Sequence, residues 1–213
     1  MATESTRVDI LDAAEQLFSL QGFAATSVRD ITTAAGVNVA AVNYHFGGKE
    51  ELLRGVTDRV VEPLNERRFM LLDALLNVSE APTVAQLVEA FVRPDIEALQ
   101  RLSSRAPHAA RYLGRIYSDQ TPWIREMTRA QFIEVGRRFV PLFAAALPEL
   151  SISELEWRIE QMVAAVVHTF ATWPEGGMSD QEASSLIHRL TGMFAAALRA
   201  PPTKEVEPKT DQR

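Results

Sequence analysis

The residues best suited to hydrogen bonding with an outside molecule fall between residues 26 and 49. Thr26 and Ser27 supply two adjacent hydroxyls, and the segment 38–45 combines asparagine amides with alanines. An asparagine amide can pair with the edge of adenine in the DNA major groove, and an alanine can contact a thymine methyl group. Hydroxyls and free backbone N–H groups at the start of a helix suit a phosphate. These residue types therefore favour recognition of DNA.

Two short helices must position these groups. The spacing of Ser27 and Asp30 resembles a capping box and predicts the start of a first helix. Gly36 can adopt a positive φ without a Cβ clash, which predicts a tight turn after that helix. Asn38 is a suitable N-cap for a second helix over residues 39–45. Because an amphipathic helix precedes them, the order of elements is that of a helix-turn-helix unit.

The charge of the whole chain does not favour DNA, since the formal net charge is −6 at pH 7. Between residues 22 and 49, however, Arg29 and Lys49 outnumber Asp30 by one, whereas residues 1–21 carry a net charge of −3. The acidic groups are therefore expected behind a weakly basic reading surface, with modest, salt-sensitive affinity. On spacing alone, a purely structural role for this glycine-punctuated run of helices is an equal alternative.

Residues 9–53 resemble the DNA-binding domain of the TetR/AcrR family of transcriptional regulators. The resemblance is carried by the segments ILDAAEQLF, GFAATSVRDI, AAGV, YHF and KEEL. It implies a homodimeric, all-helical, cytoplasmic repressor that binds a double-stranded DNA operator. Asn43 and Val39 depart from the residues that are common in the family at those places. The candidate DNA-binding residues are Thr26, Ser27, Arg29, Asn38, Val39, Ala40, Ala41, Asn43, Tyr44, His45 and Lys49.

The rest of the chain also has helical periodicity, and the predicted fold is all-α. Further helices are expected over residues 49–76, 83–102, 107–117, 122–147, 154–173 and 180–199. Pro63 and Pro94 should kink or split two of them, and Ser153 and Asp180 are the expected caps of the last two. The predicted domains are 1–48 for DNA binding, 49–200 for effector binding and dimerisation, and 201–213 as a disordered tail.

Composition excludes several other classes of protein. The chain has no cysteine, which removes disulfides and thiolate chemistry and is consistent with a reducing cytoplasm. No apolar run approaches the roughly 20 residues that a membrane helix needs, and residues 1–12 do not form a signal peptide. The four histidines are scattered, and no catalytic or metal-binding motif is present. The sequence therefore predicts neither an enzyme nor a cofactor, and no membrane partner.

The larger half is expected to bind an apolar small-molecule effector, as the family resemblance implies. The candidate effector-binding residues are Tyr112, Met127, Gln131, Trp157, Met162 and His168, although each could equally be a packing residue. Residues after 100 faintly resemble family members that respond to fatty acids or acyl thioesters. A homodimer is expected from helices 153–173 and 180–199, with Phe194 and Leu198 as test positions.

Two other functions stay open at this point. The segment 39–45 could keep the shape of a DNA-binding helix in a protein that serves only as a helical interaction module. An enzyme is the third alternative, with only isolated histidines in its favour. An inverted repeat upstream of the gene would favour the repressor.

Overall fold

The computed structural model describes residues 2–105, 107–174 and 177–202, and these residues fold into ten α-helices. The described part of the chain contains no strand, so the prediction of an all-α fold is confirmed. The first three helices are α1 (Ala2–Ala25), α2 (Val28–Ala35) and α3 (Val39–Phe46). The others are α4 (Lys49–Leu76), α5 (Val84–Arg105), α6 (Pro107–Tyr117), α7 (Pro122–Ala130), α8 (Ile133–Ala146), α9 (Ile152–Ala171) and α10 (Asp180–Leu198).

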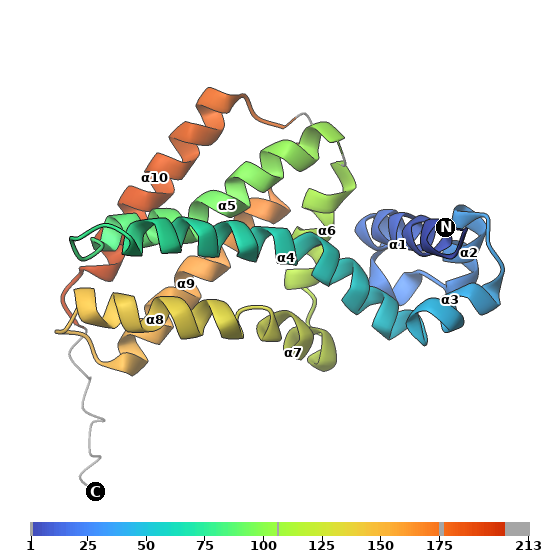
Figure 1. The fold of residues 1–213 in the computed structure, drawn as a ribbon, viewed down its shortest axis with the longest axis horizontal. Helices are drawn as coiled ribbons and strands as arrows, with labels where there is room; N and C mark the ends of the chain where they lie inside the picture. The colour runs from blue at the N-terminus through green and yellow to red at the C-terminus, as the bar shows by residue number, and fades with distance from the viewer. Residues whose placement is uncertain (1, 106, 175–176, 203–213) are drawn as a thin grey trace, which may run out of the picture.

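The molecule has a small end and a large end, and α4 runs between them (Figure 1). Helices α1, α2 and α3 form the small end, whereas α5 to α10 surround the other half of α4. Helix α6 packs against both α1 and α9, so it joins the two ends on a second side of α4. Helix α10 packs mainly against α5. The small end is therefore connected to the large end covalently by α4 and by packing through α6.

The turn between α2 and α3 forms as its sequence predicts. The Ser27 hydroxyl accepts the Asp30 N–H at 3.1 Å, and the Asp30 carboxylate accepts the Ser27 N–H at 2.8 Å, which completes the capping box. Gly36 adopts φ 68°, in the left-handed region that favours glycine. The Asn38 side chain accepts the Ala41 N–H at 3.0 Å and begins α3. Local hydrogen bonds thus fix both ends of the turn.

The start of each of the last two helices differs from its prediction. The cap of α9 is Ser151, whose hydroxyl accepts the Glu154 N–H, so the cap lies two residues before the predicted cap Ser153. The cap of α10 is Ser179, which forms a capping box with Glu182 in place of the predicted cap Asp180. In each case a serine preceded the predicted cap and had an acidic residue three positions later.

Two of the longer helices differ from their predictions at internal prolines, and a third is divided. Helices α4 and α5 continue through Pro63 and Pro94 without a break. The single helix expected over 122–147 is instead two helices, α7 and α8, which meet at Gln131 and Phe132. Gly22 interrupts the helical geometry of α1 with φ 82° and ψ 169°, as expected of a glycine that stops a helix, and the last residues of α1 follow this kink.

The N-terminal helix α1 starts at Ala2. The predicted disordered tail over 201–213 lies outside the described residues from residue 203 onward. Within the parts of the chain that the structure covers, no helix is both long and apolar enough to span a membrane.

Candidate DNA-binding surface and effector pocket

Helix α3 exposes one face and buries the other. Val42 is fully buried in the core, whereas Val39, Ala40, Asn43 and Tyr44 are exposed. Because residues three and four positions apart share a side of a helix, these four side chains form one outward face. The Tyr44 ring projects furthest, with 78% of the residue exposed. A short helix with such a face can lie in a DNA groove while Val42 anchors it to the domain.

The side chains of Asn38 and Asn43 differ in what they can offer to a partner. The Asn38 oxygen already accepts the Ala41 N–H, which leaves its NH₂ group as the available donor. The Asn43 amide is exposed and makes no hydrogen bond to any residue that the structure describes. Asn43 is therefore the amide of this face with both donor and acceptor available, while Ala41 and His45 are only partly exposed.

Thr26 and Ser27 play different parts in the structure. Thr26 is 2% exposed, and its hydroxyl donates to the Gly22 carbonyl at 2.8 Å. The predicted phosphate contact from the Thr26 hydroxyl is therefore corrected, because that hydroxyl holds the end of α1 instead. The Ser27 hydroxyl is exposed and belongs to the capping box with Asp30, so it stands at the surface where a phosphate could reach it.

The charged groups near this surface are few. The Lys49 ammonium lies 4.0 Å from the centroid of the Phe23 ring, which fixes it at the start of α4. Partial burial lowers the pKa of Lys49, and the charge of Asp30 opposes that shift. Hydrogen bonds from Ser27 lower the pKa of Asp30. Arg29 is exposed. The charged residues that the sequence places near this surface are therefore two cations and one carboxylate, and Arg7 of α1 lies over the Phe46 ring at the end of α3.

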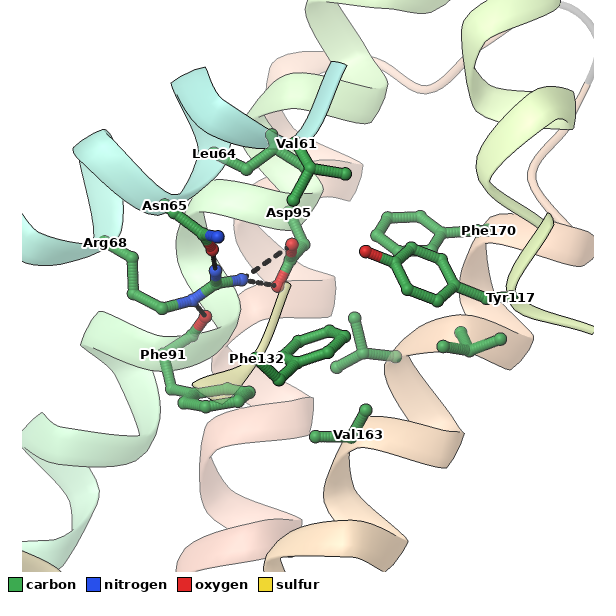
Figure 2. Close-up of a pocket in the computed structure, with 12 residues that line it drawn as sticks. Val61, Leu64, Asn65, Arg68, Phe91, Asp95, Tyr117, Phe132, Val163 and Phe170 are labelled. Atoms are coloured by element: carbon green, nitrogen blue, oxygen red, sulfur yellow. Dashed lines mark hydrogen bonds and ion pairs between the residues drawn. The ribbon is translucent and has the colours of Figure 1, made fainter. Parts of the chain in front are cut away.

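The large end contains a pocket with apolar walls and one polar end (Figure 2). It lies among α4, α5, the end of α6, the start of α8, and α9, and has space for about one water molecule. Its apolar lining residues are Val61, Leu64, Phe91, Phe132, Val163, Val166, Val167 and Phe170, and its polar ones are Asn65, Arg68, Asp95 and Tyr117.

A buried ion pair forms the polar end of this pocket. Arg68 Nη2 donates to both carboxylate oxygens of Asp95, at 2.8 and 2.7 Å. Their side chains are 3% and 6% exposed. Arg68 also donates from Nε to the Phe91 carbonyl at 3.0 Å and from Nη1 to the Asn65 side chain. Burial raises the pKa of the Asp95 carboxyl, and the Arg68 charge opposes that shift.

The six predicted effector residues do not line this pocket. Tyr112 is buried where α6 meets α4, and its hydroxyl lies 2.6 Å from that of Thr57. Met127 and Met162 are buried core residues. Trp157, 55% exposed, and His168 lie on the outer side of α9. Gln131, at the break between α7 and α8, donates to Asp58 in α4 at 2.8 Å. Gln131 is adjacent in sequence to Phe132, which does line the pocket.

Sequence reasoning missed the polar residues that do line the pocket. Arg68 falls in the buried stripe of α4 between Leu64 and Leu72, and Asp95 lies in the buried stripe of α5. A charged residue in register with an apolar stripe is unusual, because an unpaired buried charge is strongly unfavourable. Arg68 and Asp95 carry opposite charges within the apolar stripes of two successive helices. This pattern in the sequence is the signal from which their pairing could be predicted.

The two helices predicted to form a dimer are both partly open to solvent. Trp157 on α9 and Met193 on α10 are exposed apolar side chains. By contrast, the test positions Phe194 and Leu198 are buried, so a charged residue at either position would disrupt the core of one protomer. The physical reason is that α10 turns this side toward α5.

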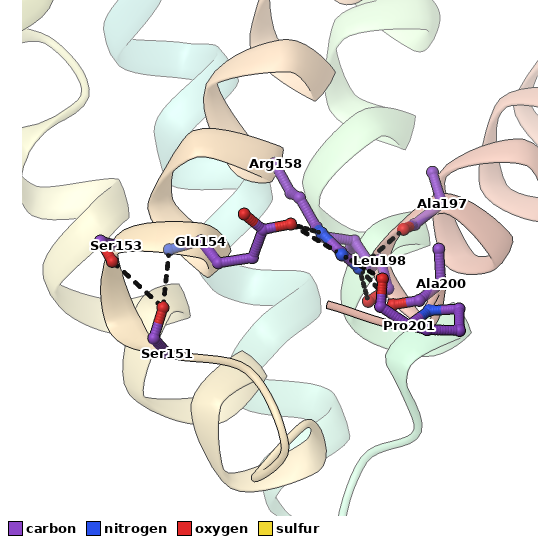
Figure 3. A network of polar contacts seen from close by, with 8 residues as sticks. All are labelled: Ser151, Ser153, Glu154, Arg158, Ala197, Leu198, Ala200 and Pro201. Atoms are coloured by element: carbon purple, nitrogen blue, oxygen red, sulfur yellow. Dashed lines mark hydrogen bonds and ion pairs between the residues drawn. The ribbon is translucent and has the colours of Figure 1, made fainter. Parts of the chain in front are cut away.

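Arg158 of α9 joins these two helices at the carboxyl end of α10 (Figure 3). Its guanidinium donates to the carbonyls of Ala197, Leu198, Ala200 and Pro201 at 2.7–3.1 Å. It also pairs with Glu154 one turn earlier in α9, at 2.7 Å. These carbonyls lie at the carboxyl end of α10, where a cation is favourable. The relative positions of α9 and α10 are therefore fixed by a specific contact as well as by packing.

The fold and the exposed helix α3 define a helical DNA-binding regulator with a helix-turn-helix domain. Comparison with known families agrees: residues 10–56 match the model for bacterial regulatory proteins of the tetR family, and residues 89–199 match the tetracyclin repressor-like C-terminal domain. The chain belongs to the TetR family of transcriptional regulators.

Individual relatives cover different parts of the chain. An HTH-type transcriptional repressor of Mycobacterium tuberculosis, Rv3405c, is 30% identical over 180 residues, which are 77% of this chain and 90% of that protein. The probable HTH-type transcriptional regulator YttP of Bacillus subtilis is 36% identical over 85 residues, and this match spans 40% of its length. The solved structure of the fatty acid degradation regulator FadR from Bacillus halodurans is similar in fold, with a TM-score of 0.66. It is 14% identical and the match covers 91% of this chain and 96% of FadR.

Proposed function

We propose that this regulator is a repressor that binds a pseudo-palindromic operator as a homodimer and is released by an apolar small molecule. The observation that carries the proposal is the outward face of α3, where Val39, Ala40, Asn43 and Tyr44 are exposed, together with the exposed Ser27 that caps α2. Such a regulator acts where the chromosomal DNA lies, which agrees with the cytoplasmic location expected from the sequence.

The dimer is proposed to form through α9 and α10. Their exposed apolar residues Trp157 and Met193 would be covered by the same helices of a second copy, which gives a four-helix interface. Two copies of α3 would then enter successive major grooves, roughly 34–36 Å apart. A two-fold symmetric protein requires an operator of matching symmetry.

The effector is proposed to bind in the pocket beside Arg68 and Asp95. Helix α4 contributes to this pocket and also carries Lys49 at its other end, next to the DNA-binding surface. A ligand that pushes α4 or the adjoining Phe132 can thus change the separation of the two α3 helices. In one state of the dimer the two α3 helices would be too far apart for the operator. A ligand that binds this state more tightly by about 3 kcal/mol weakens operator binding roughly 150-fold.

Long-chain fatty acids and their CoA thioesters are the effectors first considered from the sequence. The likeness to FadR of Bacillus halodurans supports testing them, although 14% identity carries the fold alone. The residues that line the pocket are better evidence for the class of effector than the similarity to FadR is.

The decisive experiment is a titration of fluorescently labelled DNA from the region flanking the gene, followed by fluorescence anisotropy. The wild type should bind a fragment with an inverted repeat, and Tyr44→Ala should weaken binding at least tenfold. Met70→Ala, at an exposed position near the carboxyl end of α4, is the matched control and should bind as the wild type does. If no flanking fragment binds better than unrelated DNA, the helical interaction module becomes the better interpretation.

A further inference from the structure

The polar end of the effector pocket is already balanced in charge. Arg68 and Asp95 form a buried pair, and all three guanidinium nitrogens of Arg68 donate to protein oxygens. Among the residues that the structure describes, no other lysine, arginine or histidine lines this pocket. A carboxylate that entered would place two anions around one cation in a site nearly closed to water. The unfavourable desolvation of the extra charge would have no compensating partner.

The same end of the pocket has hydrogen-bonding capacity that the protein leaves unused. Each Asp95 oxygen accepts one hydrogen bond from Arg68 and can accept another. Figure 2 shows the Tyr117 hydroxyl pointing across the pocket toward the Asp95 carboxylate, and this hydroxyl has no hydrogen-bond partner among the described residues. Burial and the charge of Asp95 raise the pKa of Tyr117, so the phenol keeps its proton and can donate.

We propose that the effector is a neutral apolar molecule with a hydroxyl group, such as a phenol or an alicyclic alcohol, and not a fatty acid. Its hydroxyl would donate to the Asp95 carboxylate and accept from the Tyr117 hydroxyl. The inference rests on the proposed function, because it names the ligand class of the effector pocket.

The other walls of the pocket fit a compact ring. The Tyr117 ring is stacked on the Phe170 ring, with centroids 6.4 Å apart, and its centroid lies 5.6 Å from that of Phe132. Since the pocket has space for about one water molecule, a ligand must displace a side chain. Phe132 stands at the break between α7 and α8, where no continuous helix restrains it. Its displacement would open the pocket next to the Tyr117 ring.

The test compares 4-butylphenol, 4-butylbenzoate and butylbenzene, which share a ring and a chain and differ in one group. Direct binding to the full chain is measured by isothermal titration calorimetry at pH 7, where the phenol is neutral and the benzoate is charged. We expect the phenol to bind at least tenfold more tightly than either analogue. Benzoate binding equal to phenol binding, or no phenol binding, would overturn the proposal.

Two variants assign the contacts. Tyr117→Phe removes one oxygen and keeps the ring, so it should weaken phenol binding roughly threefold to tenfold and leave butylbenzene binding unchanged. Unchanged phenol affinity in this variant would contradict the proposed contact. Asp95→Asn leaves the Arg68 charge unbalanced and should reverse the preference in favour of the benzoate. Should that variant fail to fold, the Tyr117→Phe result decides alone.

Operator binding by the ligand-free protein is measured in parallel by anisotropy. If the operator binds and the benzoate releases it better than the phenol does, the inference about ligand class fails while the repressor stands. If the ligand-free protein binds no operator, the proposed function fails independently of which probe the pocket prefers.

Discussion

Gly114 of α6 lies against the backbone of Ala171 of α9 so closely that a Cβ on Gly114 would be 2.7 Å from the Ala171 Cα. Helix α6 also packs against α1, so this approach sets how near the small end of the molecule lies to the large end. The nearest atoms belong to the backbone at the end of α9, which cannot move aside as a flexible side chain can.

Gly114→Ala should therefore destabilise the protein by about 1–3 kcal/mol through overpacking. The free energy of unfolding is measured by urea denaturation followed by circular dichroism. Gly136→Ala in α8 is the matched control, since a Cβ there meets nothing within 4 Å. Alanine at that helical position should be neutral or stabilising by up to about 1 kcal/mol. Equal effects of the two substitutions would contradict the close contact.

Asn43→Ala and Lys49→Ala should affect DNA binding in different ways. Asn43 has an available amide on the exposed face of α3, so its loss should cost about 1–3 kcal/mol and relax specificity at one position of each half-site. Lys49→Ala should weaken binding to all sequences similarly and reduce the dependence on salt. Affinities for a set of single-base operator variants at several salt concentrations distinguish the two. A uniform loss in Asn43→Ala would make Asn43 a backbone contact.

The capping box of α2 should respond to acid. Because hydrogen bonds from Ser27 lower the pKa of Asp30 below its unfolded value of 3.8, the contribution of the ionised Asp30 is present above that pH. It is lost as the pH falls through the lower pKa of the folded state. Ser27→Ala should raise the Asp30 pKa toward 3.8, which a carbon-13 NMR titration of the carboxyl group measures. Glu182 is the internal control, because it forms the capping box of α10 with Ser179 and its lowered pKa should not change in the Ser27→Ala variant.

Trp157→Glu combined with Met193→Glu should convert the dimer into a folded monomer. Both side chains are exposed apolar groups on the helices proposed to pair, so charges there disturb the interface without disturbing the core. Phe194→Glu, one residue further along α10, should instead unfold the chain because Phe194 is buried. Sedimentation velocity and circular dichroism measure the two effects. A dimer that survives the double substitution would place the interface elsewhere.

Gln131→Met should weaken the coupling between ligand and DNA. The Gln131 amide donates to Asp58 of α4, and the Gln131 carbonyl accepts from Asn65 of the same helix at 3.2 Å. Removing the first contact should leave operator affinity near the wild-type value. The ligand concentration that releases half of the DNA should increase about fivefold, as for a coupling loss near 1 kcal/mol. Gln120→Met, at an exposed position before α7, should not change release.

The sequence alone determined the elements whose signals are local. The capping box of Ser27, the left-handed Gly36 and the Asn38 cap each depend on neighbours within a few residues, so the turn between α2 and α3 could be predicted. Apolar periodicity predicted the all-helical fold for the same reason. The family resemblance of residues 9–53 depends on the same segment and is confirmed by the match to residues 10–56.

Only the tertiary structure decided which side chains face one another. Arg68 and Asp95 are distant in sequence and meet because α4 packs against α5, whereas Trp157 and His168 face outward because α9 turns its other side to the pocket. The buried Thr26 hydroxyl likewise depends on how α1 ends. Helix rotation about its axis is set by packing between helices, and periodicity in one helix does not specify the partner of a polar side chain.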